Sequence, residues 1–486
     1  MIKENAGFIR ELQAILTLNI GTVLSGFNMG FSAVAIPDIK QEWKMSGNST
    51  SFLPSIEASD DELSWFGKYL DINPILSKIC LFISASSVNL GQILGCLIGG
   101  YCGGRFGPKR SIMFSGFPAI LGWLCIVVSP NIGLLIAGRV VCGFSTSILS
   151  ANCSMLVAQY SSKQRRGAFL SLFALMVGIG ILFSYSIGSA LHWRYVAIFP
   201  PILYGFLMMG LIVVPESPIW LLSHRGRKEA TEALFWLRAT NEVNEELSDM
   251  DQSREKQKDG LTMAQAVKNL SRSDIRKPFL LITTNFIFVM FAGPFAMIFY
   301  AIQIFQDSGI DGNEHLAAIV VAVIRVLGGI LAIFLIQKMP RIRLSMITMT
   351  LMSISMAVLG TIMYLKEMGY DNMSLRILPI LCVTLYMFSF GAGAGPLQWV
   401  FVGELLPPEY KVLSGIVISL ATMSVFIITK IFPTLMDVLR PYGTYWLFAA
   451  ISFGSNIFYA TLMPETRGLS MFEIRKLFIG NVDNYR

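Results

Sequence analysis

Arg325 has the most unusual chemical setting in this sequence. It lies about halfway along an apolar run at residues 316–336. A charge at the centre of a bilayer costs roughly 2.5 to 3.5 kcal/mol on insertion scales, so Arg325 is expected to face a partner or the inside of a bundle. Two roles fit its guanidinium. It either bonds backbone carbonyls or a neighbouring carboxylate as part of the structure, or it grips hydroxyls or an anionic group of a bound solute.

Two glycine–proline pairs interrupt other apolar runs, at Gly293-Pro294 and Gly395-Pro396. Proline removes a backbone donor, and the groups that it frees in a membrane helix must line a cavity or be satisfied by neighbours. An ordinary proline kink is one interpretation of these pairs. The other is a hinge in moving helices around a solute site near the membrane midplane, which we expect at both positions.

Signals of other chemistry are weak. The three histidines, His192, His224 and His315, are scattered in loops without a nucleophile or carboxylate spacing, which argues against an enzyme. The seven cysteines fall almost entirely in apolar runs and have neither a disulfide framework nor metal-ligand spacing. No glycine-rich phosphate loop is found. We therefore expect no metal site and no cofactor.

The composition is that of an integral membrane protein. The chain of 486 residues is 54% hydrophobic and 14% charged, whereas a soluble domain carries roughly 25% charge. Because strand-like alternation is absent, the apolar runs predict an all-α bundle. Twelve runs are long enough to span about 30 Å of hydrocarbon, at residues 12–36, 79–101, 111–129, 132–157, 168–190, 195–214, 278–302, 316–336, 344–365, 377–402, 412–436 and 444–463.

Basic residues cluster in alternate loops and predict the orientation in the membrane. The clusters at 105–110, 163–166 and 338–343 follow the second, fourth and eighth runs, so both termini are expected in the cytoplasm. The acidic loop that contains the sequon at Asn48, and the loop that contains Asn372, then lie outside and are open to glycosylation. The net charge of +7 reflects this orientation, and no nucleic-acid partner is expected.

The chain has two similar halves. The residues Pro-Glu-Ser-Pro at 215–218 close the sixth run, and Pro-Glu-Thr-Arg-Gly at 464–468 close the twelfth. We predict two six-helix pseudo-repeats joined by a cytoplasmic helical linker, which is the architecture of a rocking transporter. The predicted divisions are a cytoplasmic N-terminus at 1–11, a first half at 12–214 with an outside loop at 37–78, a linker at 215–277, a second half at 278–463 and a cytoplasmic tail at 464–486.

Several motifs follow one another in a specific order and spacing. They are the glycine-rich basic turn at 103–110, Arg139-x-x-x-Gly143, Arg166-Gly167, the closing motifs at 215–218 and 464–468, and Gly393-x-Gly395-Pro396-x-x-Trp399 with Glu404. With these motifs, essentially the whole chain resembles the sugar porter family of the major facilitator superfamily, and most of all its insect trehalose-transporter branch. The resemblance implies the major facilitator fold and alternating access to a site between the halves.

The resemblance also implies which residues contact the solute. They are Trp399, Arg325, Tyr300, Asn28, Thr422, Phe295 and Met290. Trp399 and Tyr300 match the family's aromatic residues, which stack on sugars. Most of the amides that bind sugar hydroxyls are missing, however. Met290 replaces a Gln and Phe295 an Asn, while Arg325 stands where the family commonly has a small polar residue.

Proton coupling is not expected. Proton-coupled relatives usually carry an acidic residue in the first helix, and the matching residue here is Asn28, which does not titrate. The resemblance therefore favours downhill, facilitated movement over proton symport, although Arg139 remains where family members place a gate-related arginine.

A cytoplasmic gate of ion pairs between the halves is also implied by the resemblance. Its residues are Arg105, Lys109, Arg139, Gln159, Arg166, Glu216, Arg341, Glu404, Lys411 and Glu465. Arg166 should meet Glu404, while Glu216 and Glu465 anchor the basic turns. Lys411 is the second-half counterpart of Arg166.

One of the expected gate pairs is damaged. Gln159 stands where the family has a Glu, whose partners would be Arg341 or Arg343. The loss of partially exposed ion pairs changes the balance between two states by about 1 kcal/mol each. A bias toward the inward-facing state is predicted, unless hydrogen bonds from Gln159 preserve the lock.

Three functions are compatible with these features. The first is a facilitative carrier of a sugar such as trehalose or a hexose, placed in the plasma membrane. The second is a carrier of another polar or anionic solute that uses Arg325. The third is a membrane-embedded sensor that binds solute without moving it, against which the short segment after Arg467 argues. The expected partners are a small-molecule solute and the lipid bilayer, and the sequence carries no signal of oligomeric state.

Overall fold

The computed structural model describes residues 2–45, 74–130, 132–162, 166–240, 246–248, 250–251, 268–307, 314–370, 373–405, 412–467 and 478. Within these ranges the regular secondary structure is helical throughout. Apolar runs of this length form helices in lipid because a helix satisfies its own backbone groups. All twelve predicted spans coincide with helices, and the all-α fold in two six-helix halves is confirmed.

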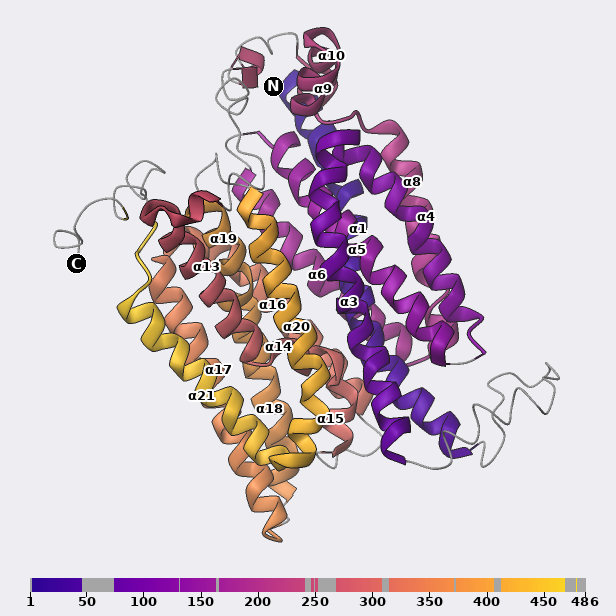
Figure 1. Cartoon of the computed structure of the whole chain (residues 1–486), viewed down its shortest axis with the longest axis vertical. Helices are drawn as coiled ribbons and strands as arrows, with labels where there is room; N and C mark the ends of the chain where they lie inside the picture. Colours follow the sequence, from indigo (N-terminus) through magenta and orange to yellow (C-terminus); the bar gives the residue numbers. More distant parts are fainter. Residues whose placement is uncertain are drawn as a thin grey trace.

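The first half contains six spans and one short helix. They are α1 (Ile2–Met45), α3 (Pro74–Phe106), α4 (Pro108–Val127), α5 (Ile132–Tyr160), α6 (Arg166–Gly188), the short α7 (Trp193–Val196) and α8 (Phe199–Val213). Within this half α3 and α4 pack against α5, and α1 packs against α6 (Figure 1).

The second half follows the same plan, with one broken span and one span that is deformed by a π turn. Its elements are α13 (Ser273–Phe291), α14 (Pro294–Phe299), α15 (Ala301–Asp307), α16 (Glu314–Lys338), α17 (Arg341–Glu367), α18 (Met373–Ser389), the π-helix η2 (Phe390–Ala394), α19 (Gly395–Leu405), α20 (Val412–Val438) and α21 (Arg440–Thr461). The halves lie side by side (Figure 1), and α3 packs against α20 and α6 against α16 across their interface.

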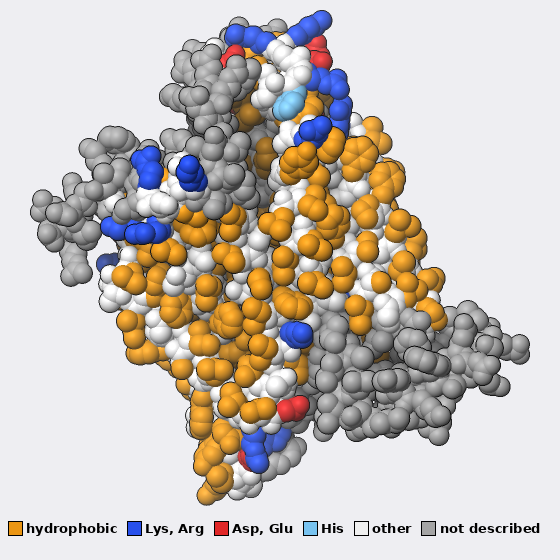
Figure 2. All heavy atoms as spheres, in the orientation of Figure 1, with side chains coloured by type: hydrophobic (Ala, Val, Ile, Leu, Met, Phe, Trp, Pro, Cys, Tyr) orange, Lys and Arg blue, Asp and Glu red, His pale blue; other side chains and the backbone are white. Residues whose placement is uncertain are grey.

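The outer surface of the bundle suits lipid. Figure 2 shows apolar side chains over both halves, with basic side chains gathered toward the two ends. Ile212, Phe114 and Phe453 are 61–69% exposed, which is unfavourable in water but not against acyl chains. Eight of the described helices meet the length and composition expected of a membrane span. The surface and the spans together make this a multi-pass membrane protein.

A small helical unit covers one end of the first half. It consists of α9 (Pro218–His224) and α10 (Arg227–Arg238), and further along the chain η1 (Asn269–Ser271) leads into α13. Ala230, Ala233, Leu234 and Leu237 are buried at helical spacing on one face of α10. We call this end of the bundle, where α1 also begins, the linker end (Figure 1).

The linker unit is fastened to the first half by arginines. Arg238 donates to the carbonyl of Tyr160 at the end of α5 and pairs with Glu246 at 2.7 Å. Arg10 of α1 donates to the carbonyl of Trp236. The unit is therefore attached to the first half at the positions where α1 and α5 reach the linker end.

Close helix contact in the first half depends on glycine. A Cβ on Gly91 of α3 would overlap the carbonyl of Val140 in α5, and a Cβ on Gly143 would overlap the carbonyl of Val88. Small residues let membrane helices approach until their backbones touch. The α3–α5 contact is thereby fixed by these two glycines.

We predict that Gly91→Ala destabilises the protein and that Gly100→Ala does not. The new methyl group of Gly91→Ala enters occupied space, at a cost of about 1 to 3 kcal/mol. Gly100 lies on the same helix with open space around it, so alanine there is neutral or slightly stabilising. Thermal unfolding of the two purified variants in detergent measures the difference. Equal melting temperatures would contradict the tight α3–α5 contact.

Candidate functional site

The seventh span is broken where α13 ends and α14 begins. Gly293 has a left-handed backbone with φ 99°, and Pro294 opens α14. A Cβ at Gly293 would also collide with the ring of Phe448. The hydroxyl of Tyr386 donates to the carbonyl of Ala292 at 2.8 Å. A polar group beside the break is thus satisfied by a neighbouring helix instead of by water.

Two further tyrosines bond to carbonyls near the break. Tyr185 of α6, in the first half, donates to Ile298 of α14 at 2.5 Å. Tyr300 donates to the carbonyl of Thr429 in α20 at 3.0 Å. The hydroxyl of Tyr300, an implied solute contact, is therefore engaged within the fold. The sequence does not predict the bonds of Tyr185 and Tyr386; its only signal is a phenol group inside an apolar run, which needs a hydrogen-bond partner.

The tenth span is deformed, not broken. Between α18 and α19 the helix widens into the π turn η2, and Gly395 keeps right-handed helical angles of φ −69° and ψ −58°. The backbone is therefore continuous through Gly395-Pro396, where the sequence predicts an interruption. A π turn accommodates a proline because it changes the hydrogen-bond register of the preceding turn.

Polar bonds join the halves where α3 and α20 run antiparallel. Asn89 donates to Thr429 at 3.2 Å, and the Cys96 thiol lies 3.9 Å from the hydroxyl of Thr422. Cys96 follows Asn89 by seven residues in α3, whereas Thr422 precedes Thr429 by seven residues in α20, as expected for antiparallel helices. Thr422, an implied solute contact, is therefore at the interface between the halves, near the middle of α20.

Arg325 lies where α16 of the second half packs against α6 of the first half. Its Nη1 comes within 2.7 Å of the position that a Cβ on Gly178 of α6 would occupy. The centre of its guanidinium is 5.7 Å from the ring centroid of Phe390 in η2. An arginine in the middle of α16 thus reaches a helix of the first half, which the hydropathy of the sequence alone does not reveal.

The other implied solute contacts differ in exposure. Met290 is buried, while Phe295 is half-buried with its ring centroid 6.3 Å from that of Phe390, edge to face. Trp399 is 46% exposed and packs edge to face against Phe286. Trp399 has the most open aromatic surface of this set.

Asn28 is held inside the first half. Its amide donates to Thr146 at 3.1 Å, while Nη1 of Arg139 donates to its side-chain oxygen at 2.9 Å and to its backbone carbonyl at 3.2 Å. Arg139 also donates to Ser32 and lies over the ring of Phe31. Neutral oxygens accept these hydrogen bonds of the Arg139 guanidinium. Asn28 and Arg139 therefore form a structural pair in which neither side chain is free.

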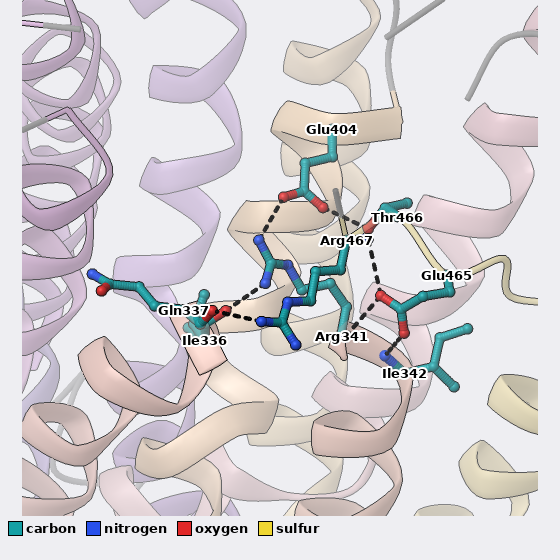
Figure 3. Close-up of polar contacts among 8 residues, drawn as sticks. All are labelled: Ile336, Gln337, Arg341, Ile342, Glu404, Glu465, Thr466 and Arg467. Atoms are coloured by element: carbon teal, nitrogen blue, oxygen red, sulfur yellow. Dashed lines mark hydrogen bonds and ion pairs between the residues drawn. The ribbon is translucent and has the colours of Figure 1, made fainter. Parts of the chain in front are cut away.

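Two glutamates hold matching helix starts at the linker end. Glu216 accepts hydrogen bonds from the backbone of Lys109 and Arg110, at the start of α4. Glu465 accepts them from the backbone of Arg341 and Ile342, at the start of α17 (Figure 3). A carboxylate is favourable at a helix N-terminus because it satisfies free N–H groups and complements the helix dipole.

The second half adds charges to this pattern (Figure 3). The Arg341 guanidinium pairs with Glu404 at 3.1 Å, and Thr466 donates to the other oxygen of Glu404 at 2.5 Å. In the first half, Ser217 donates to Gln159 at 2.5 Å. Gln159 and Glu404 therefore have matching neighbours, but only the second half has a carboxylate at this point.

The partner of Glu404 in the structure comes from the second half itself. Arg341 and Glu404 lie on α17 and α19, and Glu465 and Thr466 bring both together. The side chain of Arg166, the partner expected from the first half, lies outside the described residues.

Three other predicted sites also lie outside the described residues, namely Lys411, Asn48 and Asn372. Of the remaining gate residues, Arg105 is exposed and donates to the hydroxyl of Tyr101 at 3.5 Å. This local bond within α3 gives Arg105 no described contact with the second half.

The fold and this interface define a membrane carrier built from two similar halves. A family described as "Sugar (and other) transporter" matches residues 14–478, and the chain belongs to that family. It is accordingly a carrier and not an enzyme.

Curated relatives and solved structures agree with this assignment. The Facilitated trehalose transporter Tret1 of Apis mellifera ligustica is 28% identical over 480 residues, which cover 98% of this chain and 89% of that protein. Its counterpart of the same name in Bombyx mori is 29% identical over 468 residues, or 96% of this chain and 86% of that protein. The proton:xylose symporter XylE bound to 6-bromo-6-deoxy-D-glucose has a TM-score of 0.76 at 20% identity, covering 97% of this chain and 100% of the other.

We predict that Glu465→Ala destabilises the protein more than Glu367→Ala. Glu465 holds the first turn of α17, and the loss of such a cap costs about 0.5 to 2 kcal/mol. Glu367 ends the same helix, is exposed and pairs with Arg440, so its loss costs about 0 to 1 kcal/mol. Thermal unfolding in detergent compares the two variants. The capping role fails if Glu367→Ala is the more damaging change.

Proposed function

We propose that this protein is a facilitative carrier that moves a sugar, such as trehalose or a hexose, across a membrane by alternating access. The observation that carries the proposal is the broken seventh span of a sugar-transporter family member, which lies against the other half through the Tyr185–Ile298 bond. Rocking of the halves changes the environment of a site between them. The names of the curated relatives support a sugar as the solute.

The proposed solute site lies between the halves, about midway along α16 and α20. Arg325 and Thr422 belong to its walls, since both contact the opposite half. Phe295 and Met290 flank the broken span, and Trp399 offers an open aromatic face for stacking. Asn28 and Tyr300 act as supports of this site, because their polar groups bond within their own halves.

Uniport is supported by the neutral partners of Arg139. A proton-coupled carrier needs a group that gains and loses a proton during the cycle. Asn28 and Ser32 accept the hydrogen bonds of Arg139 without titrating. In this cycle the solute alone moves down its gradient.

We assign the linker end to the cytoplasm and the protein to the plasma membrane. The basic clusters near Arg105 and Arg341 support this orientation through the positive-inside rule. Both termini then lie in the cytoplasm, and the sequons at Asn48 and Asn372 lie outside, where glycosylation occurs.

We assign the structure to the inward-facing state of the proposed cycle. At the end opposite the linker, α14 and α15 pack against α1 of the first half, which closes that side. At the linker end, Arg341 pairs with Glu404 inside the second half, and Arg238 pairs with Glu246 inside the linker region. Neither ion pair joins the two halves. The neutral Gln159 supports a resting preference for this state, since it offers no ion pair to hold the linker end shut.

We predict that proteoliposomes containing this protein take up a labelled sugar to equilibrium and no further. Trehalose, glucose and glucuronate form the test panel, with empty vesicles as the control. An inward proton gradient at clamped voltage should leave the initial rate unchanged. If none of the three enters faster than into empty vesicles, sugar transport is excluded. Stimulation by the proton gradient would contradict uniport.

We predict that Asn28→Asp makes transport depend on pH. The new carboxyl would lie beside Nη1 of Arg139, which is now 2.9 Å from the side-chain oxygen of Asn28. One titrating group changes the rate by at most about tenfold per pH unit. Ser32→Ala removes another partner of Arg139 without adding a titratable group, and its uptake should be as insensitive to pH as that of the native protein. Identical pH profiles for the native protein and Asn28→Asp would contradict the proposal that the neutral side chain of Asn28 keeps transport independent of pH.

A further inference from the structure

The direction of Arg325 follows from the exposed face of α16. Val320, Val323, Leu327 and Phe334 are exposed at helical spacing and form the lipid face of this helix. At 100° per residue, Arg325 is two positions, or roughly 200°, from both Val323 and Leu327. The side chain thus starts on the face of α16 opposite to the lipid. It cannot reach a headgroup by extending along the outside, as a lysine near a helix end does.

The surroundings of Arg325 contain little that compensates its charge. Gly178 on one side offers only backbone, and the Phe390 ring on the other is a weak partner for a cation. The phenol of Tyr185 is within electrostatic reach and its hydroxyl donates to Ile298, but the described residues show no hydrogen bond from Arg325 to the phenol oxygen. The Nε atom is shielded from solvent and has no hydrogen-bond partner in the described ranges, where no ion pair links Arg325 to a carboxylate either. A donor left unsatisfied in this way is destabilising unless a ligand supplies the acceptor.

Arg139 shows what a structural arginine looks like in the same bundle. It is buried in the first half, and the oxygens of Asn28 and Ser32 accept its hydrogen bonds. Arg325 is half-buried, has no such set of oxygens around it and lies at the interface between the halves. Neither structural role that the sequence allows, carbonyl bonding or a carboxylate pair, is found at Arg325 among the described residues.

We propose that the solute is a sugar that carries an anionic group, and that this group binds the guanidinium of Arg325. The inference rests on the proposed function and narrows its substrate class. A carboxylate or phosphate would accept bonds from the guanidinium fork, and it would neutralise the charge between the halves. The loss of neutral amides at Met290 and Phe295 is consistent with a site that recognises charge in place of one sugar hydroxyl.

Charge transport follows from this assignment. Because no proton or other ion accompanies the solute in the proposed cycle, each anionic sugar that crosses moves negative charge across the membrane. A membrane potential that is positive inside therefore accelerates its entry into vesicles, whereas the uptake of a neutral sugar does not move charge.

The test compares three hexoses that differ at one carbon. Glucuronate has a carboxylate at C6, glucose 6-phosphate a phosphate and glucose a hydroxyl. Uptake into proteoliposomes is measured for each on the native protein and on Arg325→Gln. We expect an acidic sugar to enter faster than glucose, with acceleration by an inside-positive potential. In Arg325→Gln the ratio of acidic-sugar to glucose uptake should fall by about ten- to a hundredfold, the range for a lost charged hydrogen bond.

Two variants separate recognition by Arg325 from general effects. Arg325→Lys keeps the charge but loses the fork, so its uptake ratio should lie between those of the native protein and Arg325→Gln. Lys430→Gln removes a different cation from a membrane span, an exposed lysine near the ring of Phe426, and should leave the ratio unchanged. Measurable glucose uptake by each variant verifies that it is folded.

The outcomes distinguish this inference from the proposed function. Uptake of glucose without uptake of either acidic sugar overturns the inference and leaves the sugar carrier intact. An unchanged uptake ratio in Arg325→Gln also overturns it. A preference for glucuronate over glucose 6-phosphate, or the reverse, supports the inference and identifies the anionic group. If no sugar enters at all, the proposed function itself fails.

Discussion

The constraint on which this structure depends is that every backbone polar group inside a bilayer needs a partner within the protein. It makes all the described spans helical, and it governs the place where a helix is broken. The carbonyls of Ala292 and Ile298, on either side of the α13–α14 break, receive the hydroxyls of Tyr386 and Tyr185. Because Tyr185 belongs to the other half, the repair of the broken helix is also a bond between the halves. Opening this end of the carrier therefore requires another partner for Ile298.

The two halves share a backbone plan but differ in charge at the linker end. Glu216 and Glu465 perform the same task for α4 and α17, which reflects the repeat in the sequence. The position of Glu404 in the second half is filled by Gln159 in the first, and both keep a hydroxyl donor. A charge that only one of the two halves carries can weaken one state of a two-state carrier without changing its fold. Such states differ by only a few kcal/mol.

The two arginines Arg139 and Arg325, both inside membrane spans, also differ in their surroundings. Arg139 is surrounded by polar oxygens of its own half, whereas Arg325 points between the halves beside Gly178. Desolvation makes both unfavourable when isolated, so what each touches decides its role. A satisfied guanidinium stabilises the half that contains it. A guanidinium without such a set of oxygens is the group with which a moving solute can interact.

The sequence by itself determined the spans, their number and the repeat, because hydropathy is a property of each residue and a bilayer selects for runs of fixed length. It also indicated the break at Gly293-Pro294, since a glycine–proline pair is a local feature of the chain; the structure shows that Gly293 takes the left-handed conformation. The pairing of Glu404 with Arg341, and the continuous helix at Gly395, were decided only by the tertiary structure. So was the approach of Arg325 to α6. These features depend on distances between helices far apart in the chain, and no local pattern of residues specifies such distances.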